Sequence, residues 1–355
     1  MMSTYLTPVT HVLPLTTVRR SRELPVPGTV TVRVNERVQA QDVVAEAELA
    51  PRHYFLDLAR GLGVPVREVD QYLMKAPGDR MDAGDMIAGP VGIARRTVRA
   101  PADGTFVAVG DGRALFEARG RPFELRAGFP GVVISTDGVR SVVLETAAAL
   151  LQGVWGNGKQ DYGVLRMVGD GPGSRLQTGL LDIQLRGAIL ISGYADNAAP
   201  LHQATELSVR GLILGGLSSE LITVARRLPY PVIVMEGFGD LPISEPIFQL
   251  LKNNAGREAA LEGRPPAPYQ AERPEIIIPQ TANREADIPD DVIPLNAGIR
   301  VRALRGPERG SVGVVREILE RAIGYPSGLL ARSAVVDIEG AGPMTVPLAN
   351  LEILQ

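Results

Sequence analysis

Residues 187–239 read GAILISGYADNAAPLHQATELSVRGLILGGLSSELITVARRLPYPVIVMEGFG, and this stretch decides the fold. The apolar runs predict buried strands at 187–193, 210–216 and 231–239. The segments after them have the apolar spacing of helices and predict helices at 198–207, 218–228 and 244–254. Because short apolar strands that alternate with helices form parallel sheets, this part of the chain predicts an α/β layer.

The residues before this stretch show a different pattern, in which glycine and proline separate short runs of alternating polarity. Residues 29–49 read TVTVRVNERVQAQDVVAEAEL, with valine at every second position before a polar turn. Looser copies follow at 75–88 and 98–109, and the apolar spacing from Phe55 to Val66 predicts one short helix. Alternation with a period of two predicts strands with one buried face, so we expect a mainly β region.

The chain after the α/β layer changes composition again. Residues 257–291 are rich in Pro, Glu, Arg and Ala, with a strand-like piece at 275–279, and predict a linker or an arm that crosses the layer. Domain limits follow from these changes. We expect an N-terminal arm at 1–24, a β-rich region at 25–168, an α/β domain at 169–262, a linker at 263–292 and a small barrel at 293–355.

The composition excludes several classes of protein. The chain has no cysteine and only His11, His53 and His202 as histidines, so we expect no disulfide and no metal site. The net charge of −3 does not provide the basic field that drives non-specific nucleic-acid binding. The apolar runs fall short of the roughly 20 residues that cross a bilayer, and the start of the chain is a poor signal peptide. We therefore expect a cytoplasmic chain with no membrane insertion and no cofactor.

The N-terminal β region resembles a known fold. A Gly-Asp turn, an Ala-Gly-Asp turn and an apolar residue at 78–88, followed by Ala-Pro-Ala-Asp-Gly at 100–104, are similar to the barrel-sandwich hybrid of lipoyl and biotinyl carrier domains. In that family a modified lysine lies at the tip of a hairpin. Here Lys75 follows Met74 but directly precedes the turn at 76–79, so the resemblance implies a sandwich that carries no such group.

The α/β part resembles the swivelling phosphohistidine domain of phosphoenolpyruvate-utilising enzymes. The residues that match in place and spacing are Gly215, Gly216, Ser219, Ala225, Arg226 and Pro231. Glu220 stands where that family keeps its phosphate-accepting histidine. Because a solvated glutamate lacks the imidazole that accepts and returns a phosphoryl group, the resemblance implies the fold without the reaction.

The C-terminal segment resembles the KOW module, an SH3-like barrel of transcription elongation factors and ribosomal proteins. The resemblance rests on Gly298, Val301, Leu304, Gly306, Gly310, Gly313, Val315, Ile318 and the closing run at 346–354. Such modules bind RNA or protein through loops. Four arginines would form a basic strip for such a partner, namely Arg300, Arg302, Arg305 and Arg309, although nearby acidic residues nearly balance the charge of the segment.

A third candidate site lies at the ends of the predicted parallel strands, where such sheets bind ligands. Two glycines before a serine-capped helix could receive an anion. The candidate ligand-binding residues are Gly215, Gly216, Ser218, Ser219 and Glu220, with Ser192, Asp196 and Glu236 nearby. Ordinary capping and turn formation would explain the same residues, and the sequence holds no recognisable triad, metal cluster or carboxylate pair. We nominate no catalytic residue and disfavour an enzyme.

The expected fold class is α+β and multidomain: a β-rich domain like a barrel-sandwich hybrid, a central three-layer α/β domain with a parallel sheet, and a C-terminal SH3-like β-barrel. The expected function is a non-catalytic binding or scaffold protein with a KOW-like interaction module and a protein partner. Two alternatives remain open. One is binding to nucleic acid or to the transcription or translation machinery through the barrel, and the other is binding of a small molecule or anion at the strand ends.

Overall fold

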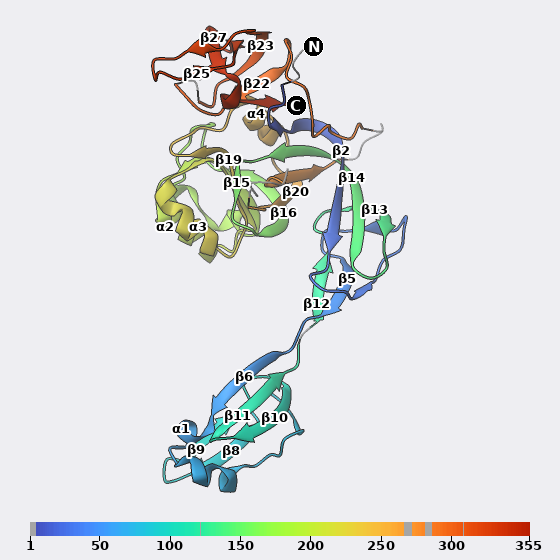
Figure 1. The fold of residues 1–355 in the computed structure, drawn as a ribbon, viewed down its shortest axis with the longest axis vertical. Coiled ribbons are helices and arrows are strands. Elements are labelled where there is room, and N and C mark those ends of the chain that lie inside the picture. Colours follow the sequence, from blue (N-terminus) through green and yellow to red (C-terminus); the bar gives the residue numbers. More distant parts are fainter. Residues whose placement is uncertain (1–4, 121, 266–271, 281–285, 308) are drawn as a thin grey trace.

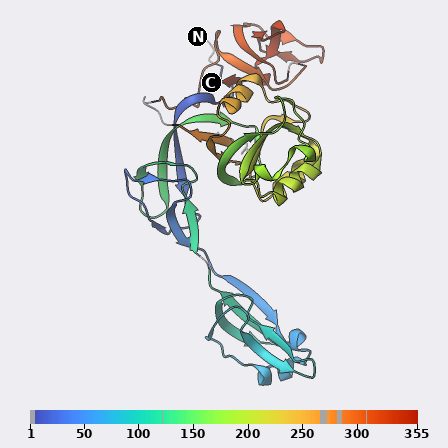
Figure 2. The ribbon, with the colours of Figure 1, turned by 180° about the vertical axis from the view of Figure 1, so that it is seen from behind.

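The computed structural model describes residues 5–120, 122–265, 272–280, 286–307 and 309–355. Strands predominate over helices in this part of the chain, as the sequence predicts. The molecule is long, and both termini lie near one end of it, while a separate lobe forms the other end (Figure 1). The view from behind shows the same narrow connection to the lobe (Figure 2).

The alternation of strands and helices predicted between residues 187 and 254 is confirmed. The strands run parallel, β17 beside β18 and β18 beside β19. Their apolar side chains are buried on both faces, with α2 and α3 packed on one face and α4 on the other. The elements are β17 (Ala188–Ala195), α2 (Ala198–Glu206), β18 (Gly211–Leu217), α3 (Ile222–Arg227), β19 (Val232–Phe238) and α4 (Glu245–Asn253).

The same sheet extends well beyond the predicted α/β segment. β16 (Gln160–Met167) adds a fourth parallel strand beside β17, and antiparallel strands continue the sheet from there. Those further strands are β20 (Glu258–Glu262), β21 (Glu275–Pro279), β14 (Ser141–Gln152), β13 (Gly131–Thr136) and β4 (Arg37–Val38), with β15 (Trp155–Gly156) at the opposite edge beside β19. Strand pairing therefore crosses the expected domain limit at residue 168.

Two segments expected to lie outside the domains also contribute strands. β2 (Val12–Glu23) of the expected N-terminal arm pairs along the length of β14. β21 of the expected linker fills the gap between β14 and β20, and Ile276, Ile277 and Ile278 are fully buried there. The reason is hydrophobic burial: an apolar run of this kind is stable only with a neighbour on each side and on each face.

β2 and β14 are long enough to enter a second core. Their far halves pack with β5 (Val43–Glu48), β12 (Pro122–Arg126) and β3 (Thr29–Val30) around a cluster that includes Phe129 and Leu144. β5 and β12 pair antiparallel, with Glu48 opposite Pro122. The chain enters the distant lobe from β5 and leaves it into β12, and we call the far ends of these two strands, with the short segments that join them to the lobe, the stalk.

The lobe, residues 52–118, has a core of its own that includes Leu58, Phe106 and Phe116. Its main sheet has the order β6-β11-β10-β7, with a hairpin of β8 and β9 beside it. The helix expected from Phe55 to Val66 is shorter than predicted, because Phe55 lies in a strand and Gly63, at φ 73°, ends the helix. The lobe's elements are β6 (Arg52–Asp57), α1 (Leu58–Leu62), η1 (Val66–Tyr72), β7 (Arg80–Met81), β8 (Met86–Val91), β9 (Arg96–Arg99), β10 (Gly104–Gly110) and β11 (Arg113–Ala118).

The C-terminal part forms a curled sheet around its own core, as the alternating pattern there predicts. The sheet has the order β1-β28-β22-β23-β26-β27, and β1 (Val9–Thr10) brings the N-terminal segment into it, parallel to β28. The remaining strands are β22 (Arg300–Ala303), β23 (Val312–Ile318), β26 (Ser333–Ile338), β27 (Gly342–Pro347) and β28 (Leu351–Leu354).

The separate core of the lobe leads to a prediction about folding. We expect that replacing residues 48–122 by Asn-Gly leaves the remaining cores folded, because Ala47 and Phe123 already face each other across a position that a two-residue turn can close, and Phe123, unlike Pro122, has the backbone N–H that such a turn needs. Differential scanning calorimetry should show the loss of the lobe's contribution to the unfolding enthalpy and a shift of only a few degrees in the remaining transition. A variant without a cooperative transition would contradict a lobe with an independent core.

Candidate functional site

The predicted anion site at the end of β18 is filled by the chain itself. Gly215 and Gly216 are buried, and residues 239–243 cross directly over them. A Cβ atom on Gly216 would lie 2.1 Å from the carbonyl oxygen of Gly239, and one on Gly215 would lie 2.5 Å from the backbone nitrogen of Ile243. The two glycines thus permit a close approach of backbone to backbone.

The other residues of that site also lack the expected geometry. Ser218 precedes a short 3₁₀ turn at Ser219–Leu221 and makes no capping hydrogen bond through its side chain, while Glu220 is exposed. The helix that follows, α3, has only six residues. Residues 239–243 therefore occupy the space over Gly215 and Gly216, and the ligand-binding role of Gly215–Glu220 stays a prediction.

The neighbouring candidates do not converge on one point. The hydroxyl of Ser192 donates to the carbonyl oxygen of Ser174 at 3.2 Å, and Asp196 pairs with Arg175 at 2.7 Å. Glu236 instead pairs with Arg302 from the C-terminal sheet. Each side chain has a structural partner of its own, so these residues do not form a shared ligand site.

The four arginines of the expected basic strip are divided between buried and exposed positions. Arg302 is 1% exposed and lies between two carboxylates, and Arg309 donates to the carbonyl oxygen of Phe238 at 3.3 Å. Arg300 pairs with Glu339 at 2.9 Å, whereas Arg305 is exposed and makes no hydrogen bond or ion pair with any described residue. Alternation along β22 places Arg300 and Arg302 on the face opposite Val301, and Arg302 is buried there because Glu236 of the α/β layer packs against it. Two of the four arginines, Arg302 and Arg309, thus contact the α/β layer.

We define the Arg302 cluster as Thr10, Glu236, Arg273, Arg302 and Glu352. The guanidinium of Arg302 contacts the carboxylates of Glu236 on β19 and Glu352 on β28. Glu352 also accepts from Thr10 at 2.8 Å and pairs with Arg273 at 3.3 Å. Burial acts to lower the pKa of Arg302, but the two carboxylates raise it above its ordinary value. The cluster therefore holds the C-terminal sheet against the α/β layer.

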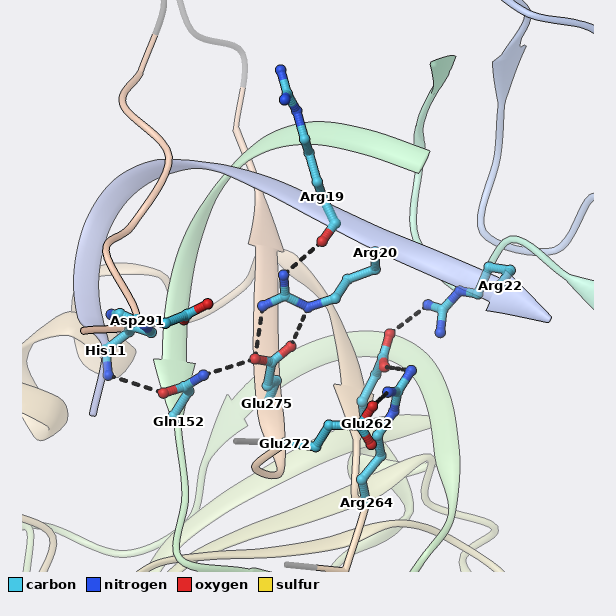
Figure 3. A network of polar contacts seen from close by, with 10 residues as sticks. All are labelled: His11, Arg19, Arg20, Arg22, Gln152, Glu262, Arg264, Glu272, Glu275 and Asp291. Atoms are coloured by element: carbon cyan, nitrogen blue, oxygen red, sulfur yellow. Dashed lines mark hydrogen bonds and ion pairs between the residues drawn. The ribbon is translucent and has the colours of Figure 1, made fainter. Parts of the chain in front are cut away.

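A second buried network lies where β2 crosses β20 and β21 (Figure 3). Glu262 and Glu275 are buried and stand directly opposite each other on those two strands. Arg20 makes two hydrogen bonds of 2.7 Å to Glu275, and Arg22, two residues further along the same face of β2, pairs with Glu262. We call these four residues the β2 clamp. Because two like charges opposite each other repel, each glutamate needs its own cation.

The side chains around the β2 clamp extend the network. Gln152 donates to Glu275 at 2.8 Å and accepts from the backbone N–H of His11 at 3.1 Å. Arg22 donates to the carbonyl oxygen of Ala127 at 2.8 Å and lies over the ring of Phe129 at 5.1 Å. Burial acts to lower the pKa of Arg20, but Glu275 outweighs it and the pKa lies above the ordinary value.

A polar hollow of about 520 Å³ opens beside the β2 clamp. Arginines and acidic residues line it in equal number, and Ser21 and Gln152 complete the wall. The charged lining residues are Arg19, Arg20, Arg264, Arg273, Glu23, Glu272, Glu275 and Asp291. Its four arginines all have carboxylate partners within the chain, so the hollow presents no free cation to a ligand.

The described residues hold no group of three or more histidine, aspartate or glutamate side chains placed to bind a metal ion. No helix in that part of the chain is long and apolar enough to span a membrane. A scan against protein-family models finds none that matches the chain, and no curated protein matches it.

The crossing of residues 239–243 over β18 yields a test. We expect Gly216→Ala to lower the free energy of unfolding by about 2 kcal/mol, because the added methyl group collides with the backbone of residues 239–241. Gly171→Ala is the control, since that glycine has open space around it and an ordinary φ. Urea unfolding would measure both variants, and equal stabilities would contradict the close crossing.

The Arg302 cluster yields a second test within the same segment. We expect Arg302→Ala to cost about 3–5 kcal/mol of unfolding free energy, because Glu236 and Glu352 would remain buried without their shared cation. Exposed Arg305→Ala should change it by no more than about 0.5 kcal/mol. Chemical denaturation of the two variants would compare the sites, and a mild effect of Arg302→Ala would argue against a clamped interface.

Proposed function

We propose that the chain is a non-catalytic binding protein that holds one module out on a stalk toward a protein partner. In this proposal the lobe is a barrel-sandwich hybrid-like module without a carried group, the α/β part is a swivelling-type domain without its reaction, and the C-terminal sheet is a KOW-like, SH3-type barrel. Together the last two form a body, and the lobe makes the contact with the partner.

The observation that carries the proposal is the separate core of the lobe beyond the paired strands β5 and β12. A module that served only to stabilise the body would be expected to pack against it. The lobe also exposes apolar side chains of a kind that protein partners cover, including Ile93 at the turn between β8 and β9 and Met74 after η1.

The charged residues support a binding role over a catalytic one. Buried carboxylates in the β2 clamp and the Arg302 cluster are each paired with arginine, which leaves them unable to act as a general base. These ion pairs join segments that are distant in the sequence, which suits a body that must keep its modules in fixed positions.

The alternative functions have less support. Binding of nucleic acid through the C-terminal barrel would depend on a basic strip of which Arg302 and Arg309 contact the α/β layer instead. Binding of an anion at the end of β18 would require residues 239–243 to leave Gly215 and Gly216. Each of these two functions would require contacts within the chain to break before the full set of predicted residues could bind a ligand.

Comparison of partner capture by two chains tests the proposal. The full chain and the variant with residues 48–122 replaced by Asn-Gly are immobilised at equal density and exposed to the same lysate. We expect proteins that are retained by the full chain to be lost with the lobe, while the thermal transition of the body persists. An identical set of retained proteins on both chains would place the binding surface on the body.

Retention on immobilised RNA and duplex DNA tests the main alternative. We expect the full chain to flow through at low salt, because Arg302 and Arg309 are committed to contacts within the chain. Retention that falls steeply with salt, and that Arg300→Ala with Arg305→Ala abolishes, would favour the nucleic-acid function instead.

A further inference from the structure

β6 forms an open edge of the lobe. The sheet order is β6-β11-β10-β7, and β6 pairs only with β11, from Arg52 opposite Ala118 to Asp57 opposite Arg113. No backbone hydrogen bond joins residues 52–56 to any other described segment. Both views show β6 on the outer side of the lobe, with no strand along its free side (Figures 1 and 2).

This edge lacks the devices that usually block strand addition. Natural edge strands carry proline, inward-pointing charges, lysine or a bulge, or are covered by another segment. β6 reads RHYFLD, its register with β11 is regular, and its formal charges stand at the two ends. Phe55, at the centre of the free edge, is 78% exposed. Such an edge favours a further strand.

We propose that β6 pairs with β6 of a second copy of this chain, antiparallel and about a two-fold axis at Phe55. Directly opposed residues point to the same face of a sheet. A two-fold axis that keeps both lobe cores on one face must therefore pass through a residue and not between two residues. The residues near the centre of β6 that could lie at the two-fold axis are Tyr54, Phe55 and Leu56.

The side chains select Phe55 among these three registers. With Phe55 at the axis, it faces itself, Tyr54 faces Leu56 of the second copy, and His53 faces Asp57 of the second copy. Apolar groups then meet apolar groups, and the imidazole of His53, which contacts Glu117 on β11 at 3.0 Å, also meets the carboxylate of Asp57 of the second copy. An axis at Leu56 would oppose Phe55 to Asp57, and an axis at Tyr54 would oppose Arg52 to Leu56.

The outer face of the lobe supports the same register. Phe55 lies opposite Leu115 on β11, and Leu115 lies opposite Ala108 on β10. Pairing at Phe55 joins this apolar row to the same row of the second copy and covers the exposed ring. The stalk holds the lobe away from the body, which leaves room for a second lobe beside β6.

The short strand limits the strength of this contact. An edge of six residues buries less than the roughly 1,600 Å² of a standard interface, so we expect reversible association with a dissociation constant in the micromolar range. The inference does not rest on the proposed function, because the purified chain can pair with itself whether or not its lobe binds another protein.

Sedimentation velocity over a dilution series tests the pairing with the full chain. We expect a monomer–dimer equilibrium that Phe55→Lys shifts toward monomer by tenfold or more, since lysine on an edge opposes strand addition. Ile93→Lys changes an even more exposed apolar residue of the lobe away from β6 and should leave the equilibrium unchanged. A monomer at every concentration up to about 0.5 mM, or a dimer that survives Phe55→Lys, would overturn the proposal.

Cysteine cross-linking tests the register, and the absence of native cysteine makes each introduced thiol unique. Phe55→Cys should form a covalent dimer under a mild oxidant, because residues directly opposite each other have Cβ atoms about 4.5–5.5 Å apart. His53→Cys faces Asp57 of the second copy and should remain monomeric, as should Ile93→Cys. Cross-linking of all three variants to the same extent would refute the register.

Discussion

Two buried glutamates that face each other across neighbouring strands set the condition on which the rest of the body depends. Glu262 and Glu275 repel each other, and a buried carboxylate without a cation is unstable. Arg20 provides the cation for Glu275, and Arg22 provides one for Glu262 in addition to Arg264, which lies two residues after Glu262. Both arginines of β2 reach their partners only if β2 crosses at the right place with the right face. The β2 clamp therefore fixes the path of β2, and through it the pairing with β14 that carries the chain toward the lobe.

The junction with the C-terminal sheet uses the same physical device. Arg302 serves two carboxylates from different segments, as a planar guanidinium can and a single ammonium group does less well. The chain contains only three lysines, Lys75, Lys159 and Lys252. Arginine paired with buried glutamate is thus a recurrent way of joining segments here, and it uses side chains that a search for ligand sites would first take as free charges.

Local periodicity predicted the parallel strands and their helices because each element is encoded by a short run of apolar residues. It did not predict that β2 and β21 pair with β14, since partners more than a hundred residues apart leave no local pattern. Gly215 and Gly216 correctly indicated that another group lies close to the backbone of β18. The sequence does not say whether that group is a ligand or, as the structure shows, residues 239–243. The sequence feature that indicates the β2 clamp is a glutamate next to an apolar run: Glu262 ends one such run and Glu275 begins another. We did not predict the clamp from this feature.

The stalk has a mechanical consequence. β5 and β12 are held in place by β3 and by the core around Phe129, and beyond Glu48 and Pro122 only two segments of the chain continue to the lobe. These two segments therefore share any tension between the lobe and the body. A force on one segment reaches the other through the last pair of the sheet, Glu48 and Pro122.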